Sequence, residues 1–370
     1  MHIQRRSFLQ ISTLATGSLL IPKLLKAFDG QPLGTVPAGN KVLIIVQFSG
    51  GNDGLNTVIP VTHDVYQKLR PTIGFKADKA LKITDDVALH PALTGLQKMY
   101  GNGDLAILNG VGYDKPDRSH FRSMDIWQTG SSSSEVWQTG WLGRYLDHAC
   151  NNCPMPTQGL ELDDTLSLTL KGKTQKGLAV KDPKKLYTQS QQKLFKQLAA
   201  QHHEEEHEKP VDYLYKTLAQ SVSSAGYIYE KTNAKASSMS YPATELGKGF
   251  KNISSLVLSD VNTKVYYISL GSFDTHVGQQ ATQQRLFKEF NDAVEVFVND
   301  MKANNRFQDV LLMTFSEFGR RVGQNASGGT DHGTANNMFF MSGGLKEKGL
   351  LNPMADLGKL TEGDLEHSVD

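Results

Sequence analysis

A near-continuous apolar run from Asn40 to Phe48 constrains the fold of this chain more than any other feature of its sequence. Branched aliphatic residues dominate the run (NKVLIIVQF), the pattern of a strand buried on both faces of a parallel sheet. The run ends in the polar, glycine-rich loop SGGNDG (49–54). Because ligands of open α/β sheets bind at the carboxyl ends of the strands, the sequence predicts a candidate site in this loop.

Further strands and helices are expected to alternate along the chain. Strands of the same buried type are predicted at 105–108, 265–270, 310–315 and 338–341. Helices are predicted over 90–100, 119–129 and 287–301. This alternation indicates one α/β domain over residues 40–370, with a doubly wound, mostly parallel sheet flanked by helices.

The segment 182–235 differs from the rest of the chain. It is rich in Gln, Lys and Glu and has no strand pattern, so we expect a helical insertion there. Its His202, His203 and His207 lie among glutamates, which favours a solvated helix face over a metal site. Outside it, Cys150 and Cys153 have no second pair to complete a zinc site, which favours a disulfide or two idle thiols.

The first 27 residues have the pattern of an export signal. Arg5 and Arg6 are followed by Phe8 and Leu9, the spacing of a twin-arginine signal, and then by an apolar run of about a dozen residues. That run is shorter than the roughly 20 residues that span a bilayer. A basic first helix of the fold is the alternative. We expect export by the twin-arginine machinery to the periplasm or beyond, with no transmembrane span in the mature protein.

The charge balance excludes one class of partner. The sequence has 39 Lys and Arg residues and 38 Asp and Glu residues, which gives a formal net charge of +1. A nucleic-acid-binding protein of this size would carry a basic excess. We therefore expect no nucleic-acid partner.

Oxygen, imidazole and guanidinium side chains gather in loops that follow the predicted strands. These residues are Asn52, Asp53, Arg118, Ser119, His120, Asp274, His276, Glu317, Arg320, Asp331 and His332. Carboxylates that converge on one sheet edge repel one another, and a bound divalent cation relieves this repulsion. A mixed Asp, Glu and His set suits Zn, Mn or Fe rather than Ca alone.

Simpler interpretations of two of these residues stay open. Asp53 stands in Asn-Asp-Gly, the composition of a tight turn. Ser119 precedes a predicted helix, where a serine is more often a plain N-cap than a nucleophile. At a helix N-terminus its hydroxyl would also lie beside unpaired N–H groups that favour an anion such as phosphate or sulfate.

Several stretches resemble a widespread family of exported bacterial proteins of unknown function, which carry twin-arginine signals and are grouped with the alkaline phosphatase and sulfatase superfamily. The matching stretches are FSGGNDGLNTVIP (48–60), LHPALTGL (89–96), RSHFRSMDIWQTG (118–130), GWLGRYLD (140–147), FDTH (273–276), TFSEFGRRV (314–322) and GGTDHGTANNMFFMSGGL (328–345). Members of this family usually continue beyond residues 368–370, which leaves open whether a closing helix is missing.

The resemblance implies roles for individual residues. Asp53 matches the metal-binding Asp after the first strand, and Ser119 matches the nucleophile that opens the next helix. Asp274 with His276 resembles the later Asp…His pair, and His332 resembles the final His. The superfamily's Asp-His-Gly appears here as Glu317-Phe318-Gly319, so a carboxylate is kept but an imidazole is lost. His120 or Asp331 is a possible replacement.

Two functions follow as alternatives. The first is an exported metal-dependent hydrolase of phosphate or sulfate esters, small or polymeric, with Ser119 as nucleophile and Arg118, Arg122 or Arg320 neutralising the transferred group. Its metal ligands would be Asp53, Asp274, His276, Glu317 and His332, and the cation Zn, Mn, Fe or Ca. The second, suggested by Phe318, is a non-catalytic periplasmic binding or assembly protein on the same fold.

Overall fold

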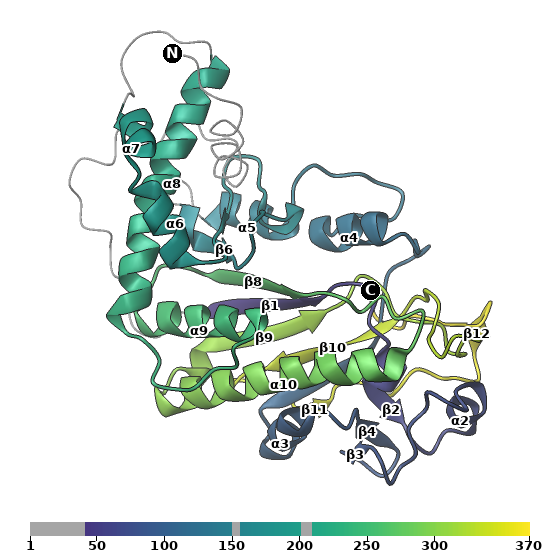
Figure 1. The fold of residues 1–370 in the computed structure, drawn as a ribbon. Helices are drawn as coiled ribbons and strands as arrows, with labels where there is room; N and C mark the ends of the chain where they lie inside the picture. Colours follow the sequence, from purple (N-terminus) through teal and green to yellow (C-terminus); the bar gives the residue numbers. More distant parts are fainter. Residues whose placement is uncertain (1–40, 150–155, 201–208) are drawn as a thin grey trace.

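A computed structural model of the chain describes residues 41–149, 156–200 and 209–370 (Figure 1). The predicted export signal (1–27), Cys150 with Cys153, and the cluster of His202, His203 and His207 lie outside the described residues.

An eight-stranded sheet forms the centre of the molecule (Figure 1). Its strands, in spatial order, are β11 (Gly349–Leu350), β5 (Leu105–Val111), β10 (Asn336–Met341), β9 (Val310–Phe315), β1 (Val42–Phe48), β8 (Val265–Leu270), β6 (Gly159–Glu161) and β7 (Leu178–Ala179). Within this sheet β10 pairs antiparallel with β5 and β9, and all other pairings are parallel. The predicted mostly parallel α/β architecture is confirmed.

The three central strands end together. Phe48 of β1 is in register with Leu270 of β8, and Gln47 with Phe315 of β9. The loops that follow these strands therefore start at one edge of the sheet, on the right in Figure 1. Because β10 runs the opposite way, the loop 328–335 before it arrives at the same edge.

Helices cover both faces of the sheet, as expected of a doubly wound fold. Ile44, Val46 and Phe48 of β1 belong to a core with α3 (Thr94–Asn102), α9 (Glu245–Leu258) and α10 (Gln279–Ala303). Ile45 points to the opposite face, where α4 (His120–Thr129) and α5 (Trp141–Ala149) contribute the packing. This alternation explains why β1 is apolar at nearly every position.

Smaller elements complete the fold. They are β2 (Val58–Pro60), β3 (Leu81–Lys82) and β4 (Val87–Leu89) in a three-stranded sheet, the hairpin of β12 (Leu360–Thr361) and β13 (Asp364–Leu365), helix α2 (Asp64–Leu69), and 3-10 turns at Gly54–Asn56, Pro156–Gln158, Leu168–Leu170 and Phe307–Asp309.

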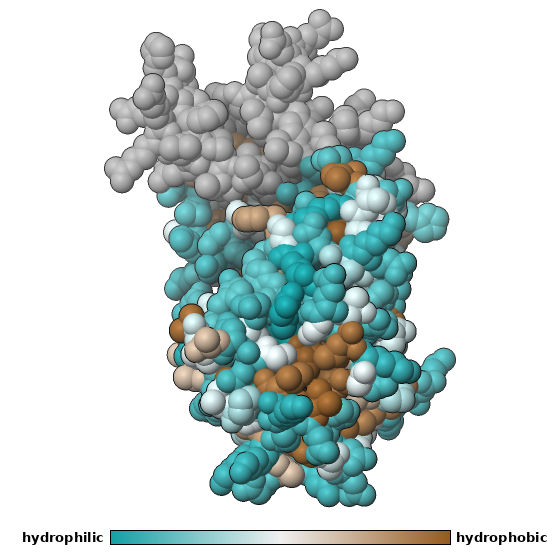
Figure 2. All heavy atoms as spheres, turned by 90° about the vertical axis from the view of Figure 1, so that its right-hand side faces the viewer, coloured by the Kyte–Doolittle hydropathy of each residue, from teal (hydrophilic) through white to brown (hydrophobic). Residues whose placement is uncertain are grey.

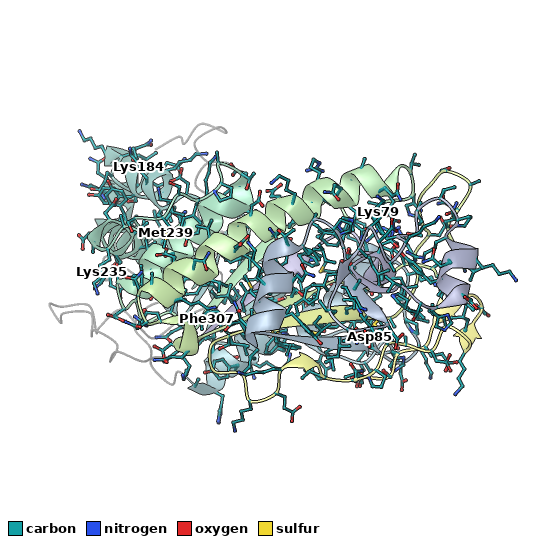
Figure 3. All side chains as sticks on the ribbon, turned by 90° about the horizontal axis from the view of Figure 1, so that it is seen from below. Lys79, Asp85, Lys184, Lys235, Met239 and Phe307 are labelled. Carbon is teal, nitrogen blue, oxygen red and sulfur yellow. The ribbon has the colours of Figure 1, made fainter. Side chains whose placement is uncertain are left out.

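The segment predicted as an insertion is helical where it is described. It contains α6 (Pro183–Ser190), α7 (Lys193–Ala200) and α8 (Lys209–Ala234), which lie away from the edge where β1, β8 and β9 end (Figure 1). Figure 3 shows Lys184 and Lys235 at the end of the molecule opposite to Lys79 and Asp85. Among the described helices, none is long and apolar enough to cross a bilayer.

Several predicted boundaries differ from those observed. The helix expected from His90 begins at Thr94, because the His90 Nδ1 atom accepts from the Ala92 amide 3.1 Å away and holds a turn there. The strand expected at 105–108 extends to Val111, and the helix expected at 287–301 spans Gln279–Ala303. In both cases tertiary pairing and packing extend the element beyond its apolar pattern.

Glu161 is a buried carboxyl group within the sheet. Its side chain is 4% exposed, and its Oε2 atom accepts from the Ser167 amide at 2.7 Å. Burial raises the pKa of Glu161 to about 7, and the Ser167 hydrogen bonds offset this only in part. The folded state therefore binds a proton that the unfolded state releases near the ordinary glutamate pKa.

We expect this carboxyl group to lower stability as the pH rises from about 4.5 to about 7, the window between its unfolded and folded pKa values. Glu161→Gln should leave the free energy of unfolding unchanged at pH 4 and raise it by about 3 kcal/mol at pH 8. Urea unfolding at the two pH values measures this, with the exposed Glu245→Gln as control. An equal effect of Glu161→Gln at both pH values would contradict the assignment.

Candidate metal centre

Two loops and the start of α4 bring one carboxylate and three imidazoles together. The Asp274 Oδ1 atom lies 3.1 Å from His276 Nε2 and 3.2 Å from His332 Nε2. The two Nε2 atoms are themselves 3.0 Å apart. From α4, His120 places its Nε2 atom 3.6 Å from Asp274 Oδ2. Ligand atoms of His120, Asp274 and His332 all lie within 4.8 Å of one another, a grouping able to hold a metal ion.

Each imidazole is oriented through its other nitrogen. His332 Nδ1 lies 2.8 Å from the Arg118 carbonyl, which can only accept, so Nδ1 carries the proton. His276 Nδ1 is 3.0 Å from Asp331 Oδ1, and His120 Nδ1 is 2.9 Å from Glu317 Oε1. Both are acceptors when ionised, so the same tautomer is favoured in all three rings. Their Nε2 lone pairs then face the Asp274 carboxylate.

This arrangement fits a bound transition metal. Two lone pairs 3.0 Å apart repel each other unless a proton or a cation lies between them. Ligand atoms of a tetrahedral zinc site are about 3.3 Å apart, since zinc–nitrogen bonds are about 2.0–2.1 Å long. Metal-binding histidines also usually donate their second N–H to a carboxylate or carbonyl, as these three rings do. The buried His120 Nε2 atom has no hydrogen-bond partner, as expected of a ligand atom.

Asp274 is held as an anion. Desolvation works to raise the pKa of this carboxyl group, but the Arg320 guanidinium, 2.6 Å from Oδ1, outweighs it, and the pKa is lowered to about 2. Asp274 is 48% exposed, so it is open to a ligand from solvent.

Glu317 orients His120 of the centre. This carboxylate is 1% exposed, and its Oε1 atom accepts both from the Gly50 amide at 2.8 Å and from His120. The hydrogen bond that His120 donates to Glu317 raises the pKa of His120, although desolvation of the ring opposes it. Among the residues of the cluster, Glu317 hydrogen-bonds with His120 and not with Asp274 or His332.

Phe318 packs against two of the imidazole rings. Its buried ring lies 4.9 Å from the His120 ring and 4.7 Å from the His332 ring, between centroids. The close packing needs glycine at position 51, where φ is +71° and a Cβ atom would lie 2.3 Å from the Phe318 ring. The imidazole that the Glu317-Phe318-Gly319 stretch lacks thus has a counterpart in His120, which approaches from α4.

Asp53 is paired within the protein. Its buried carboxylate forms a salt bridge with Arg70 Nη1 at 2.5 Å and also accepts from Leu55 N and Gln279 Nε2. It begins the 3-10 turn Gly54–Asn56 and caps it, which is the turn role that its composition suggested. As placed here, Asp53 is not among the residues grouped around Asp274.

Ser119 and Arg118 stand beside the centre. Ser119 is exposed and precedes α4, yet its hydroxyl makes no capping hydrogen bond. The Arg118 carbonyl holds His332, and its guanidinium pairs with the buried Asp364 of β13. Ser119 is thus fixed between two residues that contact the imidazole cluster.

The other two arginines are used by the fold. Arg320 is fully buried and donates to carbonyls of Gly50, Gly51, Phe273 and Thr330 as well as to Asp274. Arg122 donates to carbonyls of the loop 132–135. The Arg320 guanidinium is thus engaged by the fold, and Nη2 of Arg122 is engaged by the loop 132–135.

Sequence patterns did not identify Arg70, Gln279 or Asp364 as partners of the site. Arg70 and Gln279 bind Asp53, and Asp364 binds Arg118. In each pair the two residues are more than 15 positions apart in the sequence. No local spacing signals such pairs. His120 and Asp331 were predicted only as replacement ligands; His120 lies in the cluster, and Asp331 orients His276.

Solved structures similar to this chain include members of the alkaline phosphatase superfamily, the likeness expected from the sequence. The C-terminal periplasmic domain of EcEptC from Escherichia coli, a complex with Zn, is 10% identical, covers 82% of this chain and 74% of its own, and has a TM-score of 0.36. A member of the superfamily from Vibrio parahaemolyticus is 10% identical, with coverages of 94% and 71% and a TM-score of 0.34. A sulfatase from Pseudoalteromonas sp. is 12% identical, with coverages of 94% and 69% and a TM-score of 0.37. TM-scores this low assign neither substrate nor mechanism.

No curated protein matches the sequence. A family model described as "Protein of unknown function (DUF1501)" matches residues 40–358, which include every residue of the candidate centre. The family expected from the sequence motifs is thereby confirmed, and the chain belongs to this family of proteins of unknown function.

Proposed function

We propose that the protein is a metal-dependent hydrolase of phosphate or sulfate esters. The observation that supports this most directly is the convergence of three imidazole Nε2 atoms on Asp274, each ring fixed by an acceptor at Nδ1. Asp274, His276 and His332 would hold the metal, with His120 as a fourth ligand. Three nitrogen donors and one carboxylate favour Zn, Mn or Fe over Ca.

The residues around the centre are placed to use such a cation. A divalent metal lowers the pKa of a bound hydroxyl group and offsets negative charge that develops on an ester oxygen. Ser119 supplies a free hydroxyl beside His120, and the unpaired N–H groups of the first turn of α4 favour an anion there. The Ser119 oxygen would attack phosphorus or sulfur as the bond to the leaving alcohol breaks, and water would then release the acid and restore the serine.

The test of this function is turnover by the purified protein. We expect hydrolysis of a nitrophenyl phosphate or a nitrophenyl sulfate that a chelator abolishes and that added metal restores. Ser119→Ala should lower the rate by about a thousandfold or more, whereas Ser134→Ala, which changes an exposed loop serine, should not. Absence of turnover on both esters by metal-loaded protein would contradict the proposal.

A second candidate is a non-catalytic binding or assembly protein on the same fold. It is favoured by the pairing of Asp53 with Arg70 and by Phe318, because donors for a second metal are then engaged or lost. Metal-loaded protein without turnover but with a stable binding partner would support it. Metal-dependent turnover that Ser119→Ala removes would reject it.

We further propose that the protein works outside the cytoplasm. The proposal depends on Arg5, Arg6, Phe8 and Leu9 and on the short apolar run after them. Arg5→Lys with Arg6→Lys is expected to retain the precursor in the cytoplasm, since the signal needs the arginine pair rather than the charge. Lys23→Arg with Lys26→Arg is the matched control and should leave export unchanged. Fractionation measures both, and export of the double lysine variant would contradict the proposal.

A further inference from the structure

Two exposed apolar residues directly follow histidines of the candidate metal centre along the chain. Phe121 directly follows His120 and is 87% exposed, and Val277 directly follows His276 and is 70% exposed. His120 and His276 both contact Asp274, at 3.6 Å and 3.1 Å. Phe121 and Val277 thus belong to the two separate elements that supply His120 and His276, α4 and the loop after β8.

The exposure of Phe121 follows from the geometry of α4. This helix buries Ser123 and Ile126, and a residue two positions before Ser123 lies about 200° around the helix from it. Phe121 therefore points to solvent, although phenylalanine is among the side chains most often buried. The fold thus leaves a large apolar side chain in solvent one residue after His120.

The large hydrophobic side chains exposed in the described residues are Phe121, Val136, Trp137, Tyr145 and Val277. Arg122 ties the loop that ends near Val136 to α4 through the Ser133 carbonyl, 2.9 Å away. Figure 2 views the molecule from the end where the central strands finish; the hydrophobic patch on this face lies lower than α4 does in Figure 1, so α4 does not form it.

We propose that the substrate of this site is an amphiphilic ester. Its phosphate or sulfate group would bind at the metal centre beside Arg118, and an aryl or alkyl group next to the ester bond would pack on Phe121 and Val277. The inference depends on the proposed function. It follows from two exposed apolar residues that directly follow His120 and His276 in the chain, because apolar and polar groups at one site match the two ends of one amphiphile.

Binding of phosphonates, which cannot be hydrolysed, tests the proposal without turnover. Isothermal calorimetry on the purified metal-loaded protein would compare methylphosphonate with decylphosphonate below its micelle concentration. We expect decylphosphonate to bind at least about tenfold more tightly, because its chain removes apolar surface from water. Phe121→Ser and Val277→Ser should each lower this ratio about threefold or more, with methylphosphonate affinity unchanged.

Tyr145→Ser on α5 is the control for loss of an exposed aromatic group and should leave the ratio unchanged. Equal affinities for the two phosphonates would overturn this inference and leave the ester hydrolase standing, whereas binding of neither would overturn both. If Phe121→Ser and Val277→Ser instead abolish self-association or binding to phospholipid vesicles while the phosphonate ratio is unchanged, these side chains form a protein or membrane contact and the inference is wrong.

Discussion

Asp274→Ala is expected to lower the affinity for the bound metal by at least about 100-fold, because this carboxylate faces all three imidazoles of the centre. The protein should then pass from about one tightly bound transition metal per chain to almost none. The loss has two causes. One oxygen ligand is removed, and the negative charge that offsets that of the cation is removed with it. Elemental analysis of the purified protein measures the change directly.

Asp292→Ala is a matched control for this substitution. Asp292 and Asp274 are 40% and 48% exposed, and each is 2.6 Å from a basic nitrogen, of Lys288 and Arg320 respectively. The two substitutions therefore remove similar ion pairs, and only Asp274 lies in the cluster. Equal metal content in both variants, or a wild-type protein without metal, would show that these histidines do not form a metal site.

Arg70→Met is expected to lower the free energy of unfolding by about 3–5 kcal/mol, because it leaves the buried Asp53 carboxylate without its cation. The Arg70 side chain is fully buried and donates to Asn56 Oδ1 at 2.8 Å, to the Val322 carbonyl at 2.7 Å and to the Arg321 carbonyl at 2.9 Å, as well as to Asp53. The substitution thus also leaves buried acceptors unpaired.

The double variant Asp53→Asn with Arg70→Met separates charge from packing. If the unpaired carboxylate causes most of the loss, the double variant should be more stable than Arg70→Met alone. Arg306→Met is the control, since Arg306 pairs with Asp260 and Asp309 but is 15% exposed, and we expect it to cost about 1 kcal/mol. Urea unfolding of the four proteins measures these differences. If Arg70→Met instead binds more metal than the wild-type protein, Asp53 without its arginine acts as a metal ligand.

Much of the architecture is present in local sequence patterns. Strand β1 alternates between two cores, so it must be apolar on both faces, and its buried character is visible in the residues alone. Parallel strands with such patterns must end at one edge, so the loops holding Asp274, His276, Glu317 and His332 were predicted near one another. A helix beginning after Ser119 was likewise predicted and is observed.

The partners of the site residues were decided by tertiary structure. Asp53 and Ser119 each follow a predicted strand. Only the tertiary structure places Arg70 against Asp53 and leaves Ser119 exposed. Glu317 and His120 are 197 residues apart, and no spacing rule connects them.

The sequence by itself therefore determined the sheet, its functional edge and the residue types gathered there, because burial and strand direction are local or periodic properties. Only the tertiary structure decided which carboxylates are neutralised by arginines, which one faces the imidazoles, and which apolar side chains remain in solvent. Those outcomes depend on distances between side chains remote in sequence. A difference of a few ångströms decides whether a carboxylate is paired with an arginine or is available to a metal ion.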